Sequence, residues 1–174
     1  SEDNYLWFLT DHMAPNGKVV RWDFDNISLG FEEVISETTS SIRSVDFINQ
    51  SFVINYLDNT FSNIKYFSKD GNEIGSLKLD SLGSISGFTG RKEDKSVFYS
   101  FTNFKQPAQI YKLNFLTGIS ELFWEEKLSN FDANNYETRL EFFPSKDGTL
   151  IPIHITHKKD LKIFIKCFRI FYPP

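Results

Sequence analysis

An all-β fold is predicted by three features of the 174-residue sequence: strand-like runs at a nearly constant spacing, turn residues at matching places between them, and an aromatic-rich composition. Aromatic side chains make up 17% of the chain, with 19 Phe against 1 Met, and such residues are enriched in strands. A spacing near 45 residues, with several strands per repeat, is typical of β-propeller blades. The sequence therefore predicts a partial β-propeller of about three blades, each with about four antiparallel strands.

The repeated unit is an apolar strand, a polar turn, a second strand, a turn that contains Gly in the later two copies, and a third strand. The predicted strands are 6–9, 18–24 and 33–36 in the first copy, 52–56, 63–67 and 73–79 in the second, and 97–101, 109–113 and 119–124 in the third. A further strand precedes the second and third copies, at 42–48 and 84–89. Ile54 precedes Tyr99 by 45 residues, and Gly71 precedes Gly118 by 47. An irregular β-sandwich is the alternative, but the agreement of offsets and turns favours blades.

The stretch from Tyr136 to Lys159 is predicted to form a β-hairpin. Alternating apolar and polar residues mark strands over 139–143 and 150–156, separated by a polar turn at 144–149. Pro144 fixes its own φ, and Gly148 tolerates the positive φ that a tight reversal often needs. The pattern alone is equally compatible with a plain surface hairpin.

The residues of this hairpin resemble the prolyl oligopeptidase family of serine peptidases (peptidase S9). The similar segments are Tyr136-Glu137-Thr138, 143–149, Ile151-Pro152 and His157-Lys158-Lys159. Residues 83–90, 97–102 and 110–111 resemble the last propeller blade of that family, and 131–136 resembles the strap that follows it. The resemblance implies that residues 1–128 are the C-terminal blades of a β-propeller. It implies further that 129–160 are the strap and first hairpin of an α/β-hydrolase domain, and that 161–174 are an atypical, truncated tail.

The resemblance also implies a function. Members of the family are cytoplasmic serine endopeptidases, hydrolases that cleave short peptides after proline with a Ser, His and Asp triad, and their propeller acts as a gate for substrate. The similarity ends before any catalytic residue of the family. We therefore expect this chain to supply part of the gate and to be inactive alone. The full-length form is expected to be a monomer that takes short proline-containing peptides and no cofactor. The alternatives are a stand-alone propeller-type module that binds a protein, and a non-functional gene fragment.

A serine nucleophile is not indicated. A hydrolase of this class needs a G-x-S-x-G elbow between a strand and a helix, and the sequence contains none. Gly75-Ser76 and Gly83-Ser84 lie between predicted strands instead. Gly83, Gly87 and Gly90 do not have the spacing of a phosphate-binding loop, so they are predicted to be turn or close-approach glycines.

Metal ligation is not indicated either. The three histidines are His12, His154 and His157, and structural roles are expected for all of them. His154 and His157 are three positions apart, so a strand would point them to opposite faces. A single cysteine, Cys167, excludes an internal disulfide and weakly favours a reducing compartment. We predict no catalytic, cofactor-binding or metal-binding residue in this chain, and the sequence assigns no substrate-binding residue.

Charge and hydropathy exclude other functions. The net charge is −4 with a pI near 5.4, so the chain lacks the basic surface expected of a nucleic-acid-binding protein. No run of 18 apolar residues indicates a membrane span. The paired carboxylates at 23/25, 32/33 and 125/126 are expected on solvated turns and edges. The three Trp residues, Trp7, Trp22 and Trp124, are expected to fill the space between blades.

The last dozen residues depart from the family pattern from about Ile163, which a truncated or frame-shifted coding region would explain. An amphipathic helix on a membrane surface is the alternative, since the cations at 162, 166 and 169 would share one helical face. The β-branched and aromatic residues around them argue against that helix.

Overall fold

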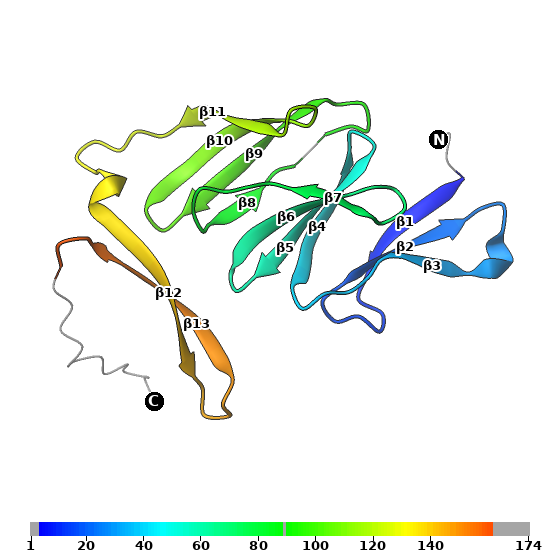
Figure 1. Ribbon diagram of the computed structural model, residues 1–174, viewed down its shortest axis with the longest axis horizontal. Coiled ribbons are helices and arrows are strands. Elements are labelled where there is room, and N and C mark those ends of the chain that lie inside the picture. Colours follow the sequence, from blue (N-terminus) through cyan, green and yellow to red (C-terminus); the bar gives the residue numbers. More distant parts are fainter. Residues whose placement is uncertain (1–3, 89, 162–174) are drawn as a thin grey trace. The chain divides into compact units, whose positions relative to one another are not determined.

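The computed structural model describes residues 4–88 and 90–161, which are almost entirely antiparallel β-structure (Figure 1). The chain forms two compact units that divide between Lys127 and Leu128. Three consecutive sheets make up the first unit, and a two-stranded sheet lies in the second. No helix among the described residues has the length and apolar character needed to cross a membrane.

Each sheet of the first unit is a meander of neighbouring strands. The first sheet contains β1 (Tyr5–Thr10), β2 (Lys18–Asp23) and β3 (Phe31–Ile35), with the 3-10 turn η1 (Ile27–Leu29) before β3. The second contains β4 (Ser41–Ile48), β5 (Ser51–Asp58), β6 (Phe61–Phe67) and β7 (Glu73–Ser76). The third contains β8 (Ser84–Ser86), β9 (Ser96–Asn103), β10 (Gln106–Asn114) and β11 (Ile119–Glu125). These are successive blades of a partial β-propeller, which confirms the predicted fold class.

All the predicted strands are present, but several bounds differ. β7 ends at Ser76 and β8 at Ser86, so both are shorter than the apolar runs at 73–79 and 84–89 suggested. In the first blade the described residues supply three strands, which correspond to the last three of the other sheets. The two 3-10 turns were not predicted, because a single turn leaves no hydrophobic period to detect.

The turn between the predicted strands 52–56 and 63–67 is much tighter in the structure. β5 extends to Asp58 and β6 starts at Phe61, so only Asn59 and Thr60 connect them. Both have positive φ, 45° and 86°. Two-residue hairpin loops need such angles to match the twist of the strands. Asn tolerates such angles, but Thr seldom does, so an Asn-Thr pair does not predict a two-residue turn.

The apolar core lies between successive sheets, and β5 contributes to both of its parts. Phe52 and Ile54 pack with Val19 of the first sheet, whereas Val53 packs with Val97 of the third. Neighbouring positions of a strand point to opposite faces, so a strand between two sheets is apolar throughout. This explains why 52–56 reads as a nearly continuous apolar run.

Hydrogen bonds also join the second and third sheets. The Ser62 amide donates to the Gly83 carbonyl at 2.9 Å, and the Ile85 amide donates to the Ser62 hydroxyl at 2.9 Å. A Cβ at Gly83 would lie 2.5 Å from the ring of Phe101 and from the carbonyl oxygen of Thr102. Gly83 is therefore a close-approach glycine, as predicted.

The tryptophans are placed differently from one another. Trp7 packs at the first interface, stacked 6.0 Å from Phe47, as expected of a ring between blades. Trp124 is 49% exposed, so no blade among the described residues covers it, and its place between blades stays a prediction. Trp124 pairs with Ile110, and these positions face away from the second sheet. Trp22 contacts Phe24 and Phe31 at the edge of the first sheet.

The second unit is built on the predicted hairpin. The 3-10 turn η2 (Ala133–Asn135) precedes β12 (Tyr136–Pro144), which pairs along its whole length with β13 (Leu150–Lys158). Gly148 has φ 84°, as its place in the turn requires. The turn is closed by a hydrogen bond of 2.8 Å that the Ser145 amide donates to the Thr149 carbonyl. The amphipathic helix considered for the tail falls on residues 162–174, which lie outside the described residues.

Candidate functional site

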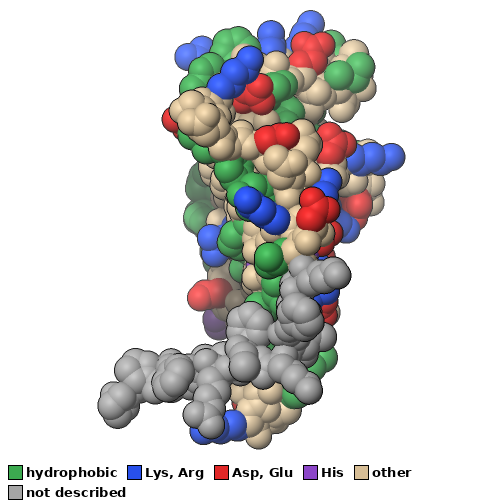
Figure 2. Space-filling view, turned by 90° about the vertical axis from the view of Figure 1, so that its left-hand side faces the viewer, with side chains coloured by type: hydrophobic (Ala, Val, Ile, Leu, Met, Phe, Trp, Pro, Cys, Tyr) green, Lys and Arg blue, Asp and Glu red, His purple; other side chains and the backbone are tan. Residues whose placement is uncertain are grey.

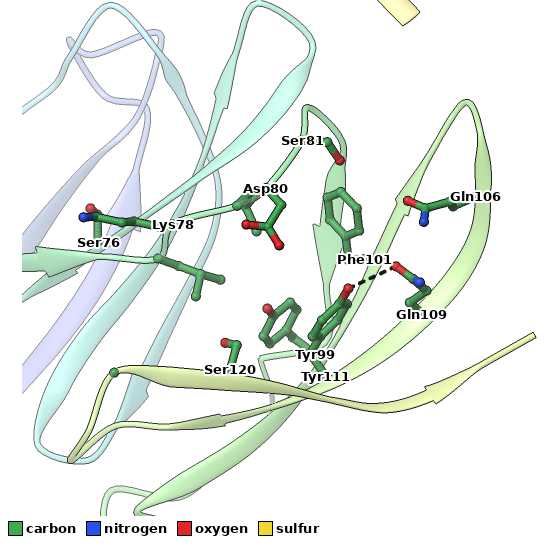
Figure 3. A pocket seen from close by; sticks show the side chains of 13 residues that line it. Ser76, Lys78, Asp80, Ser81, Tyr99, Phe101, Gln106, Gln109, Tyr111 and Ser120 are labelled. Atoms are coloured by element: carbon green, nitrogen blue, oxygen red, sulfur yellow. Dashed lines mark hydrogen bonds between the residues drawn. The ribbon is translucent and has the colours of Figure 1, made fainter. Parts of the chain in front are cut away.

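The site with the most varied chemistry is a cavity of about 450 Å³ between the second and third sheets (Figure 3). One wall is the segment 76–81, at the end of β7 and beyond it, and the other is formed by β9, β10 and β11. The lining includes Asp80, Tyr99, Gln109, Tyr111 and Ser120. β7 and β8 are joined by a long connection and not by a tight turn. The segment 77–81 of this connection can therefore line the cavity with polar side chains.

Two tyrosines form the floor of the cavity. The ring of Tyr99 is stacked between Phe88, with centroids 5.2 Å apart, and Tyr111, with centroids 5.4 Å apart. Burial raises the pKa of the Tyr99 phenol, and burial together with the carboxylates of Asp80 and Glu125 raises the pKa of the Tyr111 phenol. Both side chains therefore remain neutral at physiological pH and can offer hydroxyl groups to a ligand.

Gln109 fixes the orientation of the second tyrosine. This glutamine is only 8% exposed, and its Oε1 accepts a hydrogen bond of 3.1 Å from the Tyr111 hydroxyl. Its Nε2 donates to Glu125 Oε2 at 3.2 Å. A buried amide satisfied at both ends gives this part of the wall a defined geometry.

The two charged residues of the wall are Asp80 and Lys78. In Figure 3 the Asp80 carboxylate is directed toward the rings of Tyr99 and Phe101, whereas the Lys78 ammonium lies far from the two tyrosines. Among the described residues, no ion pair or side-chain hydrogen bond involves the Asp80 carboxylate. Asp80 is exposed to solvent, so the part of the cavity beside the tyrosines carries a solvent-accessible carboxylate.

This arrangement favours binding rather than acyl transfer. Ser76 and Ser120 line the cavity, but the lining contains no histidine, the general base that activates the nucleophile of a serine peptidase. Aromatic rings, amides and one carboxylate are the groups of a recognition site.

The histidines are distributed over both units. His12 lies in the turn between β1 and β2, and His154 and His157 lie on β13 of the second unit, on opposite faces of the strand. The His157 Nε2 lies 3.3 Å from Glu137 Oε1, its cross-strand neighbour, and its Nδ1 lies 2.8 Å from the Lys158 carbonyl. Within residues 4–88 and 90–161 there is no group of three or more side chains suited to hold a metal ion. Cys167 lies outside the described residues.

Two of the three carboxylate pairs, 23/25 and 32/33, have partners in and beside the first sheet. Arg21 binds Glu32 through two hydrogen bonds of 2.8 and 2.9 Å, and Lys18 lies 3.1 Å from Glu33. Hydrogen bonds from the Asn26 side chain and the Asp25 amide lower the pKa of Asp23. On the face displayed in Figure 2, acidic and basic side chains are interspersed rather than gathered by sign. These pairs serve turns and cross-strand contacts, as expected.

Sequence reasoning missed the cavity. The residues that line it come from four segments of the chain. An alternating pattern predicts each strand, but it does not predict which strands pack against one another. The repeat offset was the one feature of the sequence that could have indicated the cavity. It aligns Lys65 with Tyr111, and both are polar residues on the cavity-lining face of their sheets.

Comparison with known proteins gives a consistent result. The sequence model described as "Prolyl oligopeptidase, N-terminal beta-propeller domain" matches residues 1–126. A prolyl endopeptidase of Elizabethkingia meningoseptica is 34% identical over 163 residues, covering 93% of this chain and 23% of its own. A prolyl oligopeptidase of Omphalotus olearius is 28% identical over 169 residues, covering 92% and 22%.

Solved structures agree with the sequence matches. A structure from a study of two prolyl endopeptidases superposes with a TM-score of 0.82 at 30% identity, over 91% of this chain and 24% of that one. Prolyl oligopeptidase B from Galerina marginata, bound to a 25-residue macrocyclization substrate, also superposes with a TM-score of 0.82, at 26% identity, over 91% and 23%. The chain thus spans about a quarter of the length of the relatives that it matches.

Proposed function

The chain belongs to the prolyl oligopeptidase family, matching its N-terminal propeller domain, and we propose that it is the substrate-gating portion of a serine endopeptidase that cleaves short peptides after proline. The observation that carries the proposal is the match over residues 1–126, which coincides with the first compact unit, 1–127. In the complete enzyme, a cytoplasmic monomer, the blades would restrict entry to small, unstructured peptides.

The second unit has its own part in this proposal. Residues 129–160 would be the strap and the first hairpin of the α/β-hydrolase domain, and 161–174 a tail that departs from the family pattern. The likeness to a prolyl endopeptidase structure covers 91% of the chain and therefore extends beyond the propeller match. This supports a continuous segment that runs from the last blades into the hydrolase domain.

Catalysis would reside outside this chain. An acyl-enzyme mechanism needs a Ser activated by a His, with a third group that orients the base. His154 and His157 lie on β13, and the cavity that Ser76 and Ser120 line contains no histidine. The propeller would add selectivity by excluding substrates that are large or folded, and it would contribute no chemical step.

A stand-alone module that binds a protein is the second candidate, and one observation favours it. Large apolar side chains are exposed on the open face of the third sheet, among them Phe98 at 45% and Phe123 at 66%. In a complete propeller a neighbouring part of the ring would cover this face. In a separate module a partner would do so.

A chimaeric enzyme tests the gating proposal. The corresponding segment of the Elizabethkingia meningoseptica prolyl endopeptidase is replaced by this chain, and cleavage is measured with a short proline-containing fluorogenic peptide and with an unfolded protein of about 100 residues. The proposal expects cleavage of the peptide and rejection of the protein. A folded chimaera that cleaves both equally, or neither, would count against it.

The isolated 174-residue chain provides the second arm of the test. We expect no cleavage of the same fluorogenic peptide above a mock preparation, and no labelling by a fluorophosphonate that reacts with activated serines. Cleavage by the isolated chain would place a catalytic group within it and overturn the assignment. A discrete symmetric oligomer that tightly binds a protein would favour the module instead.

A further inference from the structure

The propeller repeat builds two equivalent cavities, one at each interface between sheets. The second cavity, of about 430 Å³, lies between the first and second sheets. The strand registers pair Tyr56 with Asn63 in one blade and Phe101 with Gln109 in the next. Further matched lining positions are Lys65 with Tyr111, Gly71 with Gly118 and Glu73 with Ser120. The two cavities can therefore be compared position by position.

The cavity between the first and second sheets contains a cation of its own. The Lys65 ammonium lies 2.8 Å from Glu73 Oε2, and both side chains line that cavity. An internal ion pair thus occupies the polar part of the space.

The cavity between the second and third sheets has lost this pair and kept a negative charge. Tyr111 stands where Lys65 does, and Ser120 where Glu73 does. The acidic group comes instead from the connecting segment, as Asp80. Burial is the main cause that raises the pKa of Tyr99 and Tyr111, and the Asp80 carboxylate adds to the increase at both phenols. Lys78 lines the same cavity, but its ammonium lies away from the two tyrosines (Figure 3), so the space between Asp80 and the tyrosines has a carboxylate and no cation at the position equivalent to Lys65.

We propose that this cavity binds an organic cation with several N–H donors, a primary ammonium or a guanidinium group, between the Asp80 carboxylate and the hydroxyl oxygens of Tyr99 and Tyr111. Such a group would place an external cation where the sister cavity holds Lys65. Hydrogen bonds from a charged donor to a carboxylate are about twice as strong as neutral ones, and phenol oxygens accept the remaining donors. The adjacent aromatic rings favour a cation over a neutral ligand.

The cation could belong to a free amine or to a Lys or Arg side chain of a peptide. The site lies in the propeller and uses no group assigned to the gating proposal. The failure of the cation-binding proposal would therefore leave the gating proposal unaffected. The probes are butylammonium and ethylguanidinium chloride for the free compounds and a tetrapeptide with one arginine for the side chain. Butanol is the neutral isostere.

Binding is measured on the 174-residue chain by NMR, with ¹³C-labelled tyrosine rings and constant ionic strength. We expect saturable shifts of the Tyr99 and Tyr111 resonances with a cationic probe and no saturable shift with butanol. Asp80→Asn should weaken binding at least about fivefold, because the charged acceptor is lost. Glu93→Gln changes an exposed carboxylate elsewhere and should leave binding unchanged.

A second variant tests whether a cation at the position of Lys65 excludes the external one. Tyr111→Lys introduces an ammonium at the position of Lys65 and should abolish binding of the external cation. Unchanged binding in folded Asp80→Asn, or equal shifts with butanol, would overturn the proposal. Saturable shifts with the arginine tetrapeptide alone would support a peptide side chain as the source, and shifts with the small probes would support a free amine or guanidine.

Discussion

The side-chain amide of Asn55 donates a hydrogen bond to the main-chain carbonyl of Ile85 at 3.1 Å, and so ties β5 of the second sheet to β8 of the third. Asn55 is 7% exposed within an otherwise apolar strand. A polar residue in that position has no packing advantage over an aliphatic one. Its place is explained by the bond that it makes across the interface.

Asn55→Ala is therefore expected to lower the free energy of unfolding by about 1–3 kcal/mol, the usual cost of losing a buried hydrogen bond and its packing. Urea denaturation followed by tryptophan fluorescence measures this. Ser86→Ala, an exposed change on β8, is the control and should cost less than about 0.5 kcal/mol. Equal effects of the two changes would mean that the bond contributes nothing to the interface.

Gly83→Ala should be strongly destabilising, because the new methyl group would lie 2.5 Å from the Phe101 ring and the Thr102 carbonyl. Overpacking of this kind costs about 1–3 kcal/mol or more. Gly75→Ala is a matched control, since its Cβ would meet only Tyr66, at 3.5 Å, an ordinary contact. Thermal unfolding of both variants gives the comparison. A Gly83→Ala protein as stable as the Gly75→Ala protein would refute the close approach.

Burial raises the pKa of the Tyr66 phenol well above its ordinary value, and the hydroxyl oxygen is enclosed. The folded state thus favours the neutral phenol. This contribution to stability is complete below the unfolded pKa of about 10 and is lost as the pH rises above it. Between pH 9 and 11.5, the free energy of unfolding should fall more steeply in the natural chain than in Tyr66→Phe. Parallel pH profiles would show that the ionisation of Tyr66 is not linked to unfolding.

The turn of the hairpin lowers the pKa of Asp147, chiefly through the hydrogen bond that the Thr149 amide donates to its Oδ1 at 3.0 Å, with a further contribution from the Thr149 side chain. A lowered folded pKa means that the stabilisation is present at neutral pH and lost as the pH falls through that pKa. In Thr149→Ala the Asp147 pKa should rise only part of the way to its ordinary value, since the amide remains. Carboxyl ¹³C titration by NMR measures both. A complete return to the ordinary value would assign the effect to the side chain alone.

The strands were predictable and the cavity was not, for a physical reason. A strand is specified by its own residues, through alternation, β-branched or aromatic content and flanking turns. For that reason 52–56 and 97–101 were identified correctly, whereas the extent of β7 was overestimated, because Leu77 and Leu79 continue the apolar pattern beyond Ser76 while packing against the third sheet. The placement of Asp80 beside Tyr99 depends on how two sheets pack, and no local pattern contains that information.

The open face of the third sheet leads to a last prediction. Phe98, Phe123 and Trp124 are 45%, 66% and 49% exposed, and the rings of Phe98 and Phe123 are in contact at 4.9 Å. Exposed apolar rings that lie together promote association, whereas single exposed apolar residues do not. The isolated chain should therefore show a mass that increases with concentration in sedimentation equilibrium, and Phe123→Lys should shift it toward the monomer. Leu116→Lys, in an exposed turn where Leu116 is 67% exposed, should leave the mass unchanged. If both lysine variants act equally, added charge and not the patch controls association.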